Sequence, residues 1–315
     1  MNVYLAPMEG LTTYIFRTAW NRYYGGMDKY FTPFLASRRL SSRDKNDVMP
    51  EHNVGMETVP QILTNKSDEF IEIATTLQEY GYKEVNLNLG CPSGTVVSKK
   101  RGAGFLGVPE ALDVFLDEIF ADCPVPISIK TRIGQKDVRE WSHLLEIFAK
   151  YPIKELTIHP RLQVEGYQGT PHLEAYEMAE HQLNCPLCYN GDIASVADYE
   201  KIQESFPNLT SVMIGRGILQ NPGLLNRIKE NPVKPEEALG TLKSFHDEIL
   251  AGYEGIMSGD TNVLYKMKDL WTFLGKSFHS PEAYVKKIRK SSNLVEYRLA
   301  VQTIFRECPL QWSEK

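Results

Sequence analysis

Short apolar segments alternate with longer amphipathic ones along the first two-thirds of the chain, and this alternation constrains the fold more than any other feature. The short segments are Val3–Pro7, Tyr30–Pro33, Thr58–Leu63, Glu84–Asn88, Ile127–Arg132, Glu155–His159, Leu187–Asn190 and Ser211–Gly215. Most of them lack the polar alternation of a strand with one face in water. They predict eight strands buried on both faces, as in a parallel sheet.

Segments with helical periodicity lie between these strands. They are Thr13–Tyr23, Ser67–Tyr80, Pro109–Phe120, Arg139–Lys150, His172–His181, Val196–Ser205 and Gly217–Lys229. Eight strands that alternate with helices over roughly 230 residues predict an α/β fold of the (β/α)8 TIM-barrel type. A doubly wound sheet is the competing fold, but it would place a glycine-rich fingerprint after the first strand, and APMEGLTT is not one.

The pattern changes near Asn231. The segment NPVKPEE has two prolines and three charges, which is typical of a linker, and only helical patterns follow it. Leu264, Met267, Trp271 and Leu274 recur at steps of three and four residues and predict one buried stripe. We therefore expect a barrel domain over 1–232 and a small helical-bundle domain over 236–315.

Composition narrows the class of protein. The five cysteines are an odd number in a long chain, which favours reduced thiols and a cytoplasmic protein. Cys185 and Cys188 have no second pair at zinc-ribbon distance, so we expect structural thiols and no metal. No apolar run is long enough to span a membrane, and the N-terminus does not resemble a signal peptide. The net charge of −5 argues against indiscriminate binding to nucleic acid, although a local basic patch remains compatible with it.

Unusual residues follow almost every predicted strand, at the end of a barrel where active sites lie. They are Ala6–Met8, Gln61, Asn88–Pro92, Lys130–Arg132, His159–Arg161, Asn190–Asp192 and Gly215–Gly217. A single polar residue at such a position usually caps an element or is satisfied within the core. A ring of six or seven indicates a functional site.

Two glycine-bearing turns, NGDI at 190–193 and IGRG at 214–217, follow the last two strands. Phosphate groups bind at this place in many barrels, because glycine lets backbone N–H groups approach the anion. Arg216 would add a bidentate contact. Each turn alone could be an ordinary strand-to-helix connection, but the pair favours phosphate.

Three further side chains are candidates for chemistry. Lys130 needs an anionic partner if it is buried, and both a carboxylate and a reduced flavin would serve. His159 could contact a flavin, although a lone histidine is more often structural. Cys91 lies in a Gly-Cys-Pro turn and could transfer protons, since an ordinary thiol pKa near 8.5 can be shifted by its surroundings, but most single cysteines have no chemical role.

The densest basic run is Lys286–Lys290, and Lys266, Lys268 and Lys276 precede it. The run is either a solvated helix face or a contact for an RNA backbone.

These segments resemble the tRNA-dihydrouridine synthases, flavoenzymes with an FMN-binding barrel and a C-terminal helical domain. The similar segments are LAPMEG at 5–10, PQI around Gln61, NLNLGCPS at 86–93, GAGFL at 102–106, IKTRIG at 129–134, IHPR at 158–161, NGDI at 190–193 and MIGRG at 213–217. They extend in the family's order over about two-thirds of the chain. The combination of N-x-x-GCPS with K-x-R-x-G is the specific part.

The resemblance implies a role for each matching position. Ala6, Pro7 and Met8 would line the flavin ring, Gln61 and Lys130 would bind its polar edge, and His159 would lie near it. Asn190, Gly191, Asp192, Gly215 and Arg216 would hold the phosphate end. Asn88 and Arg132 would bind the uracil, with Tyr167 beside them, and Cys91 would be the acid.

The resemblance also implies the reaction. NADPH would reduce FMN, hydride would pass from flavin N5 to C6 of a flipped-out uridine, and Cys91 would protonate C5. We expect tRNA as the substrate and a monomeric chain. One alternative is an FMN-dependent reductase of small pyrimidines or enones, which would not need the helical domain. The other is a non-catalytic RNA-binding protein, which would not need the intact ring of polar strand ends.

Overall fold

The computed structural model describes residues 1–311 and contains a closed barrel of eight parallel strands in the order β1 to β8. The strands are β1 (Asn2–Leu5), β2 (Lys29–Leu35), β3 (Thr58–Ile62), β4 (Val85–Leu89), β5 (Ile127–Arg132), β6 (Leu156–His159), β7 (Leu187–Asn190) and β8 (Ser211–Ile214). All eight predicted strands are confirmed, with differences of a residue or two at their ends. The predicted fold class is therefore confirmed.

The helices up to the end of the barrel are α1 (Tyr14–Tyr23), α2 (Ser42–Val48), α3 (Ser67–Glu79), α4 (Gly94–Val97), α5 (Pro109–Asp122), α6 (Glu140–Phe148), α7 (Leu173–Gln182), α8 (Val196–Ser205), α9 (Arg216–Gln220) and α10 (Leu224–Ile228). Three 3-10 helices accompany them: η1 (Pro50–His52), η2 (Gly102–Gly107) and η3 (Gln163–Glu165). The prediction of one helix over Gly217–Lys229 is wrong. It is interrupted because Pro222 has no N–H to donate and the side chain of Asn221 instead accepts a hydrogen bond from the Gly223 N–H (3.1 Å).

Five further segments follow: α11 (Pro235–Ile256), α12 (Asp260–Leu274), η4 (Gly275–Ser277), α13 (Glu282–Lys290) and α14 (Leu294–Glu307). Contacts divide the chain into two compact units. The barrel unit comprises Met1–Pro7, Asp28–Asp192 and Ile202–Met213, and the helical unit comprises Met8–Met27, Ile193–Lys201 and the chain from Ile214 onward. None of the helices among residues 1–311 is both long and apolar enough to cross a membrane.

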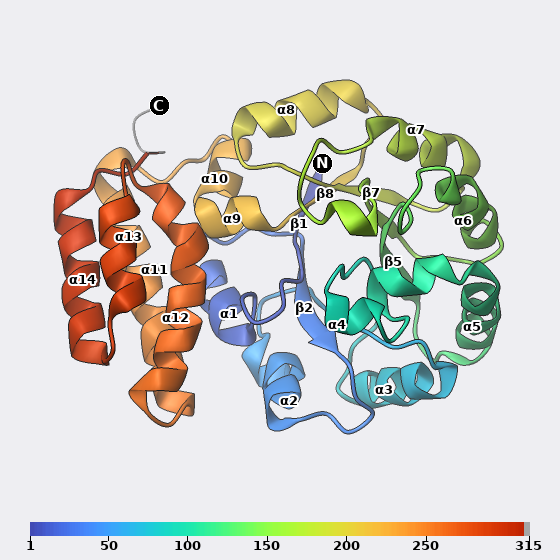
Figure 1. Cartoon of the computed structure of the whole chain (residues 1–315), viewed down its shortest axis with the longest axis horizontal. Helices are drawn as coiled ribbons and strands as arrows, with labels where there is room; N and C mark the ends of the chain where they lie inside the picture. The colour runs from blue at the N-terminus through green and yellow to red at the C-terminus, as the bar shows by residue number, and fades with distance from the viewer. Residues whose placement is uncertain (312–315) are drawn as a thin grey trace. The chain divides into compact units, whose positions relative to one another are not determined.

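The barrel unit has its strands at the centre and α3, α5, α6 and α7 outside them (Figure 1). An ion cluster lies where the strands begin. Lys29 Nζ lies 3.1 Å from Glu84 and 3.5 Å from Glu155, and Lys154 Nζ lies 2.6 Å from Glu84. Tyr4 also donates to Glu155. Because active sites of barrels lie at the opposite end, we assign this cluster to stability.

In the helical unit, α11 to α14 lie side by side (Figure 1). A buried series of hydrogen-bonded side chains joins three of these helices. The Trp271 indole can only donate, so Tyr297 Oη accepts from it (2.8 Å) and donates its own proton to His246 Nε2 (2.6 Å). His246 Nδ1 then carries the ring proton toward Asp247 (2.9 Å). The series requires neutral His246.

Acid is expected to destabilise the protein through His246. Burial lowers the pKa of His246 below its ordinary value of 6.5, although Asp247 opposes the shift. The stability that the neutral His246 ring contributes is therefore fully present when the pH is above the ordinary pKa of 6.5, and it is lost as the pH falls below that value. We expect the thermal unfolding midpoint to fall between about pH 7 and about pH 5. His246→Gln, which does not titrate, should show a smaller fall, and the exposed His143→Gln should behave like the unmodified chain. An equal fall in all three proteins would contradict the assignment.

Candidate active site

The ends of β3 and β4 bring Gln61, Asn88 and Cys91 together. Gln61 is paired with Asn86 in the register of β3 and β4, and its Nε2 donates to Asn86 Oδ1 (2.8 Å). Asn88 Nδ2 donates to Gln61 Oε1 (2.7 Å). The predicted cofactor residue Gln61 and the predicted substrate residue Asn88 are thus hydrogen-bonded to each other.

The turn that carries Cys91 is held on both sides. Asn88 Oδ1 accepts from the N–H groups of Gly90 (3.0 Å) and Cys91 (2.9 Å). On the other side, the Ala103 N–H donates to the Cys91 carbonyl (3.1 Å). Gly102 has a φ of +55°, and a Cβ there would lie 2.9 Å from the Cys91 carbonyl oxygen. Only glycine fits, so η2 packs tightly against a partly exposed Cys91.

Arg132, at the end of β5, also holds this turn. Its Nε donates to the Gly90 carbonyl (3.0 Å) and its Nη1 to the Leu162 carbonyl (2.9 Å). The guanidinium lies 5.4 Å from the centre of the Tyr167 ring, and that ring lies 6.0 Å from His159. Tyr167 is exposed, whereas burial lowers the pKa of Arg132. A cation and an exposed aromatic ring therefore flank the Cys91 turn.

Lys130 lies beside Asn88 in the register of β4 and β5. Within residues 1–311, its ammonium group makes no hydrogen bond or ion pair. Removal from water, with a smaller contribution from the nearby charge of Arg132, lowers the pKa of Lys130 to about 8. The alternative that Lys130 pairs with a carboxylate is therefore wrong for the described chain. An anionic group, as a flavin becomes on reduction, would supply the missing partner, so the site fits such a cofactor.

Arg161 belongs to the predicted strand-end residues His159–Arg161, but the sequence assigned it no role. It is fully buried, and its Nη1 lies 3.1 Å from His159 Nε2 and donates to Asp192 Oδ1 (3.0 Å). The same guanidinium pairs with Asp192 through Nη2 and donates to the Gln168 (3.1 Å) and Gly169 (2.6 Å) carbonyls. Its place two residues after His159 in the IHPR motif was the available signal.

The residues predicted near the phosphate lie in both units. Asn190, Gly191 and Asp192 belong to the barrel unit, where Asn190 Nδ2 donates to the Met213 carbonyl (2.7 Å). Gly215 and Arg216 belong to the helical unit, at the start of α9. A Cβ on the following residue, Gly217, would lie 2.1 Å from the Ile193 carbonyl oxygen, so this turn requires glycine.

The first-strand motif is divided in the same way. Ala6 and Pro7 belong to the barrel unit, where Ala6 is buried with the interior cluster of Tyr4 and Phe31. Met8 belongs to the helical unit, and its N–H donates to Thr12 Oγ1 (2.8 Å).

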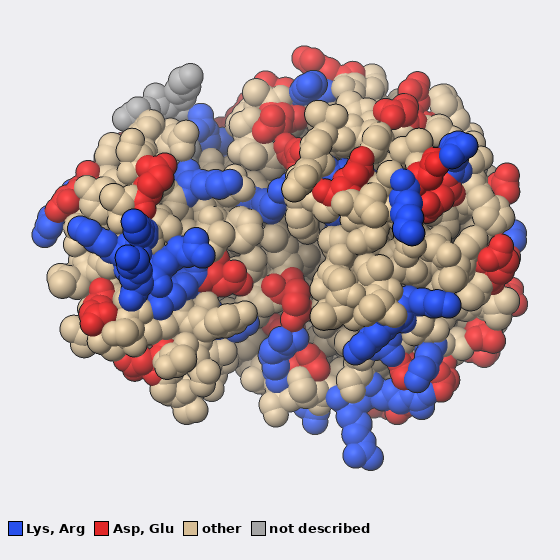
Figure 2. Space-filling model, in the orientation of Figure 1, with Lys and Arg blue, Asp and Glu red and all other residues tan. Residues whose placement is uncertain are grey.

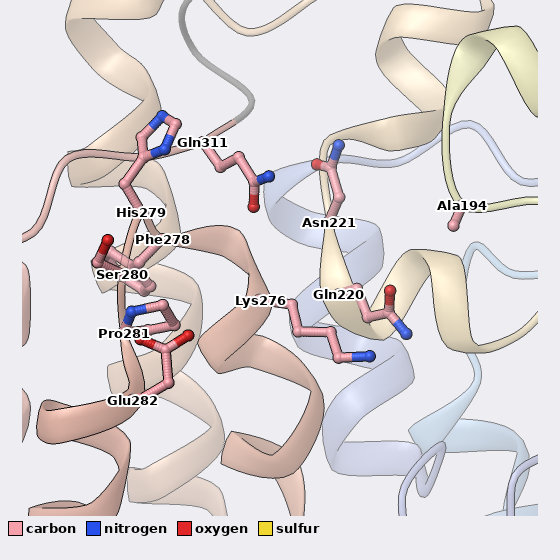
Figure 3. Close-up of a pocket in the computed structure, with 10 residues that line it drawn as sticks. All are labelled: Ala194, Gln220, Asn221, Lys276, Phe278, His279, Ser280, Pro281, Glu282 and Gln311. Atoms are coloured by element: carbon pink, nitrogen blue, oxygen red, sulfur yellow. The ribbon is translucent and has the colours of Figure 1, made fainter.

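A cavity of about 510 Å³ lies within the helical unit and contains none of the predicted site residues. Gln220 and Asn221 line it, with Lys276 of η4 and the segment 278–282 (Figure 3). Its lining carries both Lys276 and Glu282, so its charge does not favour an anion. Residues 1–311 contain no cluster of three or more potential metal ligands.

Known proteins are similar to this chain over almost its whole length. A family model described as "Dihydrouridine synthase (Dus)" matches residues 4–305. The tRNA-dihydrouridine synthase B of Pasteurella multocida is 30% identical over 74% of this chain and 70% of its own. The tRNA-dihydrouridine(16) synthase of Neisseria meningitidis serogroup B is 28% identical over 97% of this chain and 95% of its own.

Solved structures share the fold at much lower identity. Morphinone reductase has a TM-score of 0.54 at 11% identity, and the alignment covers 78% of this chain and 88% of that one. A second structure of that protein, in complex with tetrahydroNAD, has a TM-score of 0.53 at 11% identity, and the alignment covers 78% of this chain and 90% of that one. Histamine dehydrogenase from Rhizobium sp. 4-9 has a TM-score of 0.57 at 11% identity and covers 78% and 49%.

Proposed function

The chain belongs to the dihydrouridine synthase family, and from that premise we propose that it reduces the C5–C6 bond of specific uridines in tRNA to 5,6-dihydrouridine. FMN is the proposed cofactor and NADPH the proposed reductant. Morphinone reductase, which shares this fold, has been solved in complex with tetrahydroNAD, and hydride chemistry on this fold is consistent with that complex. We assign the activity to a monomer in the cytoplasm, without a metal.

The observation that carries the proposal is Lys130 at the end of β5, for which the described part of the chain, residues 1–311, provides no ion-pair partner. Gln61 lies near the end of β3 and His159 at the end of β6 of the same barrel. An anionic flavin edge would therefore meet the Lys130 cation and these two hydrogen-bonding side chains. Ala6, Pro7 and Met8 are proposed to line the flavin ring. Asn190, Gly191, Asp192, Gly215 and Arg216 are proposed to hold its phosphate.

Each remaining site residue has a task that follows from its chemistry. A bound FMN would supply the hydride chemistry, with hydride taken from NADPH and delivered from N5 to C6 of the uracil. Cys91 donates its Sγ proton to C5 and becomes a thiolate. The positive charges of Arg132 and Lys130 are close enough to stabilise that thiolate. Asn88 and Arg132 bind the uracil oxygens, and the exposed Tyr167 ring contacts the flipped nucleotide.

A comparison of substrates separates this function from a small-molecule reductase on the same barrel. Purified protein with its flavin and NADPH is given either tRNA that lacks dihydrouridine or free uridine. We expect product from tRNA and much slower turnover of free uridine, because most of the binding energy would come from the RNA backbone. Equal efficiency on the two substrates would favour the small-molecule reductase. A colourless protein that binds tRNA would favour the non-catalytic alternative.

The basic face of α13 is proposed to contact the tRNA backbone. Lys286, Arg289 and Lys290 are exposed at steps of three and four residues on this helix, and Figure 2 shows Lys and Arg side chains gathered there. Changing all three to Gln should weaken tRNA binding and reduce the slope of log K against log salt. Each lost phosphate contact should remove about 0.7–0.9 from that slope.

Three exposed lysines of other surfaces, Lys83, Lys136 and Lys201, supply the matched control when changed to Gln together. The control removes the same charge but should leave the salt slope unchanged. If the two triple variants weaken binding equally, α13 is not a specific RNA contact and acts only through net charge.

A further inference from the structure

Four buried side chains form a continuous chain of hydrogen bonds inside the barrel. Ser128 lies opposite Asn86 in the register of β4 and β5, and Asn86 lies opposite Gln61 in the register of β3 and β4. Asn86 Nδ2 donates to Ser128 Oγ (3.0 Å), and Gln61 Nε2 donates to Asn86 Oδ1 (2.8 Å). Asn88 Nδ2 donates to Gln61 Oε1 (2.7 Å), and Asn88 Oδ1 accepts from Cys91 N–H (2.9 Å). All four side chains are at least nine-tenths buried.

Main-chain and carboxylate groups at the two ends fix the direction of this chain. Ser128 Oγ faces the Val85 carbonyl (3.4 Å) and the Glu84 carboxylate, which can only accept, so Ser128 donates there and accepts from Asn86. At the other end, the N–H groups of Gly90 and Cys91 can only donate. No amide in between can flip without placing two acceptors or two donors against each other.

We propose that Asn88 is a positioning residue for Cys91, and that the amide chain behind it keeps its oxygen turned toward the Cys91 turn. Asn88 Oδ1 uses both of its acceptor sites on Gly90 and Cys91, and Nδ2 uses one of its two protons on Gln61. Judged from residues 1–311, the Asn88 side chain therefore has one N–H of Nδ2 left to donate to a ligand. Asn88 can meet a carbonyl oxygen of a base but not a ring N–H.

The thiol itself reports on this positioning. The purified protein is treated with iodoacetamide across a range of pH, and alkylation of each cysteine is followed by peptide mass spectrometry. The limiting rate at high pH, where the thiol is ionised, measures how accessible the turn leaves the partly exposed Cys91 sulfur. Asn88→Ala removes the acceptor of two N–H groups, so the limiting rate at Cys91 should rise about tenfold.

Asn88→Asp is the conservative variant. It keeps an oxygen for the two N–H groups but loses the donor, so the limiting alkylation rate at Cys91 should stay within about twofold of that of the unmodified protein. The added carboxylate should move the midpoint of the pH profile upward, because a nearby negative charge disfavours the thiolate. Its reduction of tRNA should nevertheless be lost, since the N–H for the base has gone.

Two more variants test the row of hydrogen-bonded side chains behind Asn88 and the integrity of the fold. Ser128→Ala removes the acceptor of Asn86 Nδ2 at the far end and should raise the Cys91 rate about threefold, because the amides that hold Asn88 then lose one of their hydrogen bonds. Asn53→Ala is the matched control, since Asn53 has the same 7% exposure as Asn88 and donates to two main-chain carbonyls elsewhere. It should leave Cys91 unchanged. Alkylation of Cys185 in each sample shows whether a variant has loosened the whole protein.

An unchanged limiting rate in Asn88→Ala, or a rate in Asn88→Asp as high as that in Asn88→Ala, would overturn the positioning role. An unchanged rate in Ser128→Ala would overturn the role of the chain. The inference rests on the proposed function only for the loss of turnover. The alkylation readout needs no RNA, so failure of the inference and failure of the proposed function are distinguishable.

Discussion

Replacing Cys91 with alanine is expected to lower the rate of tRNA reduction by about 10²–10⁴-fold, the usual contribution of a positioned general acid. The turn should keep its shape, because alanine retains the N–H and the carbonyl through which residue 91 is hydrogen-bonded to Asn88 Oδ1 and to the Ala103 N–H. Flavin absorbance and the rate at which NADPH bleaches it should therefore remain as in the unmodified protein. The measurement is single-turnover formation of dihydrouridine in tRNA beside the rate of flavin reduction.

Cys185→Ala is the control for this variant. Cys185 is also a partly exposed thiol, but it precedes β7 and so lies at the opposite end of the strands from Cys91. The Cys185→Ala variant should reduce tRNA at the rate of the unmodified protein. If Cys91→Ala reduced tRNA as fast as Cys185→Ala, another group would have to be the acid.

Arg161→Met is expected to lower the free energy of unfolding by about 1–3 kcal/mol, because the hydrogen bonds that the buried guanidinium donates are all lost. The variant leaves the Gln168 and Gly169 carbonyls without their donor and Asp192 without its cation. Since His159 and Asp192 are proposed to contact the cofactor, flavin should also be lost. Urea unfolding and the ratio of flavin to protein absorbance measure the two effects.

The pair Arg139–Asp137 provides a matched control for this effect. Its aspartate side chain is 39% exposed, close to the 40% of Asp192, but its arginine is 88% exposed whereas Arg161 is fully buried. Arg139→Met should therefore change stability far less, because water replaces the lost partner. Equal losses in the two variants would mean that the burial of Arg161 does not determine its contribution.

The strands could be predicted from the sequence because a strand buried on both faces carries a short run of apolar residues between polar segments, as Val3–Pro7 does. Lys130 and Cys91 could be chosen because they interrupt that pattern at the end where barrels bind ligands. The two short helices α9 and α10 were joined in the prediction, although Asn-Pro-Gly at 221–223 is a recognisable break.

Other features depend on partners that a linear pattern does not reveal. Arginine is a residue type expected at the surface, and Arg161 is buried only because Asp192, distant in the chain, and two carbonyls surround it. The role of Asn88 in the Cys91 turn depends on Gln61 and Asn86, which meet only through the register of two strands. Residue types at strand ends therefore indicated a site, while the hydrogen bonds within it required coordinates.

The central claim is that one flavin site on this barrel reduces uridine within tRNA. The most direct test is an anaerobic single turnover, in which protein reduced with NADPH and freed of excess nucleotide is mixed with tRNA that lacks dihydrouridine. We predict that the flavin is reoxidised as dihydrouridine appears, one for each flavin, and that neither change occurs without tRNA. Flavin that stays reduced with tRNA present, or tRNA that gains no hydrogen while the flavin is reoxidised, would contradict the account.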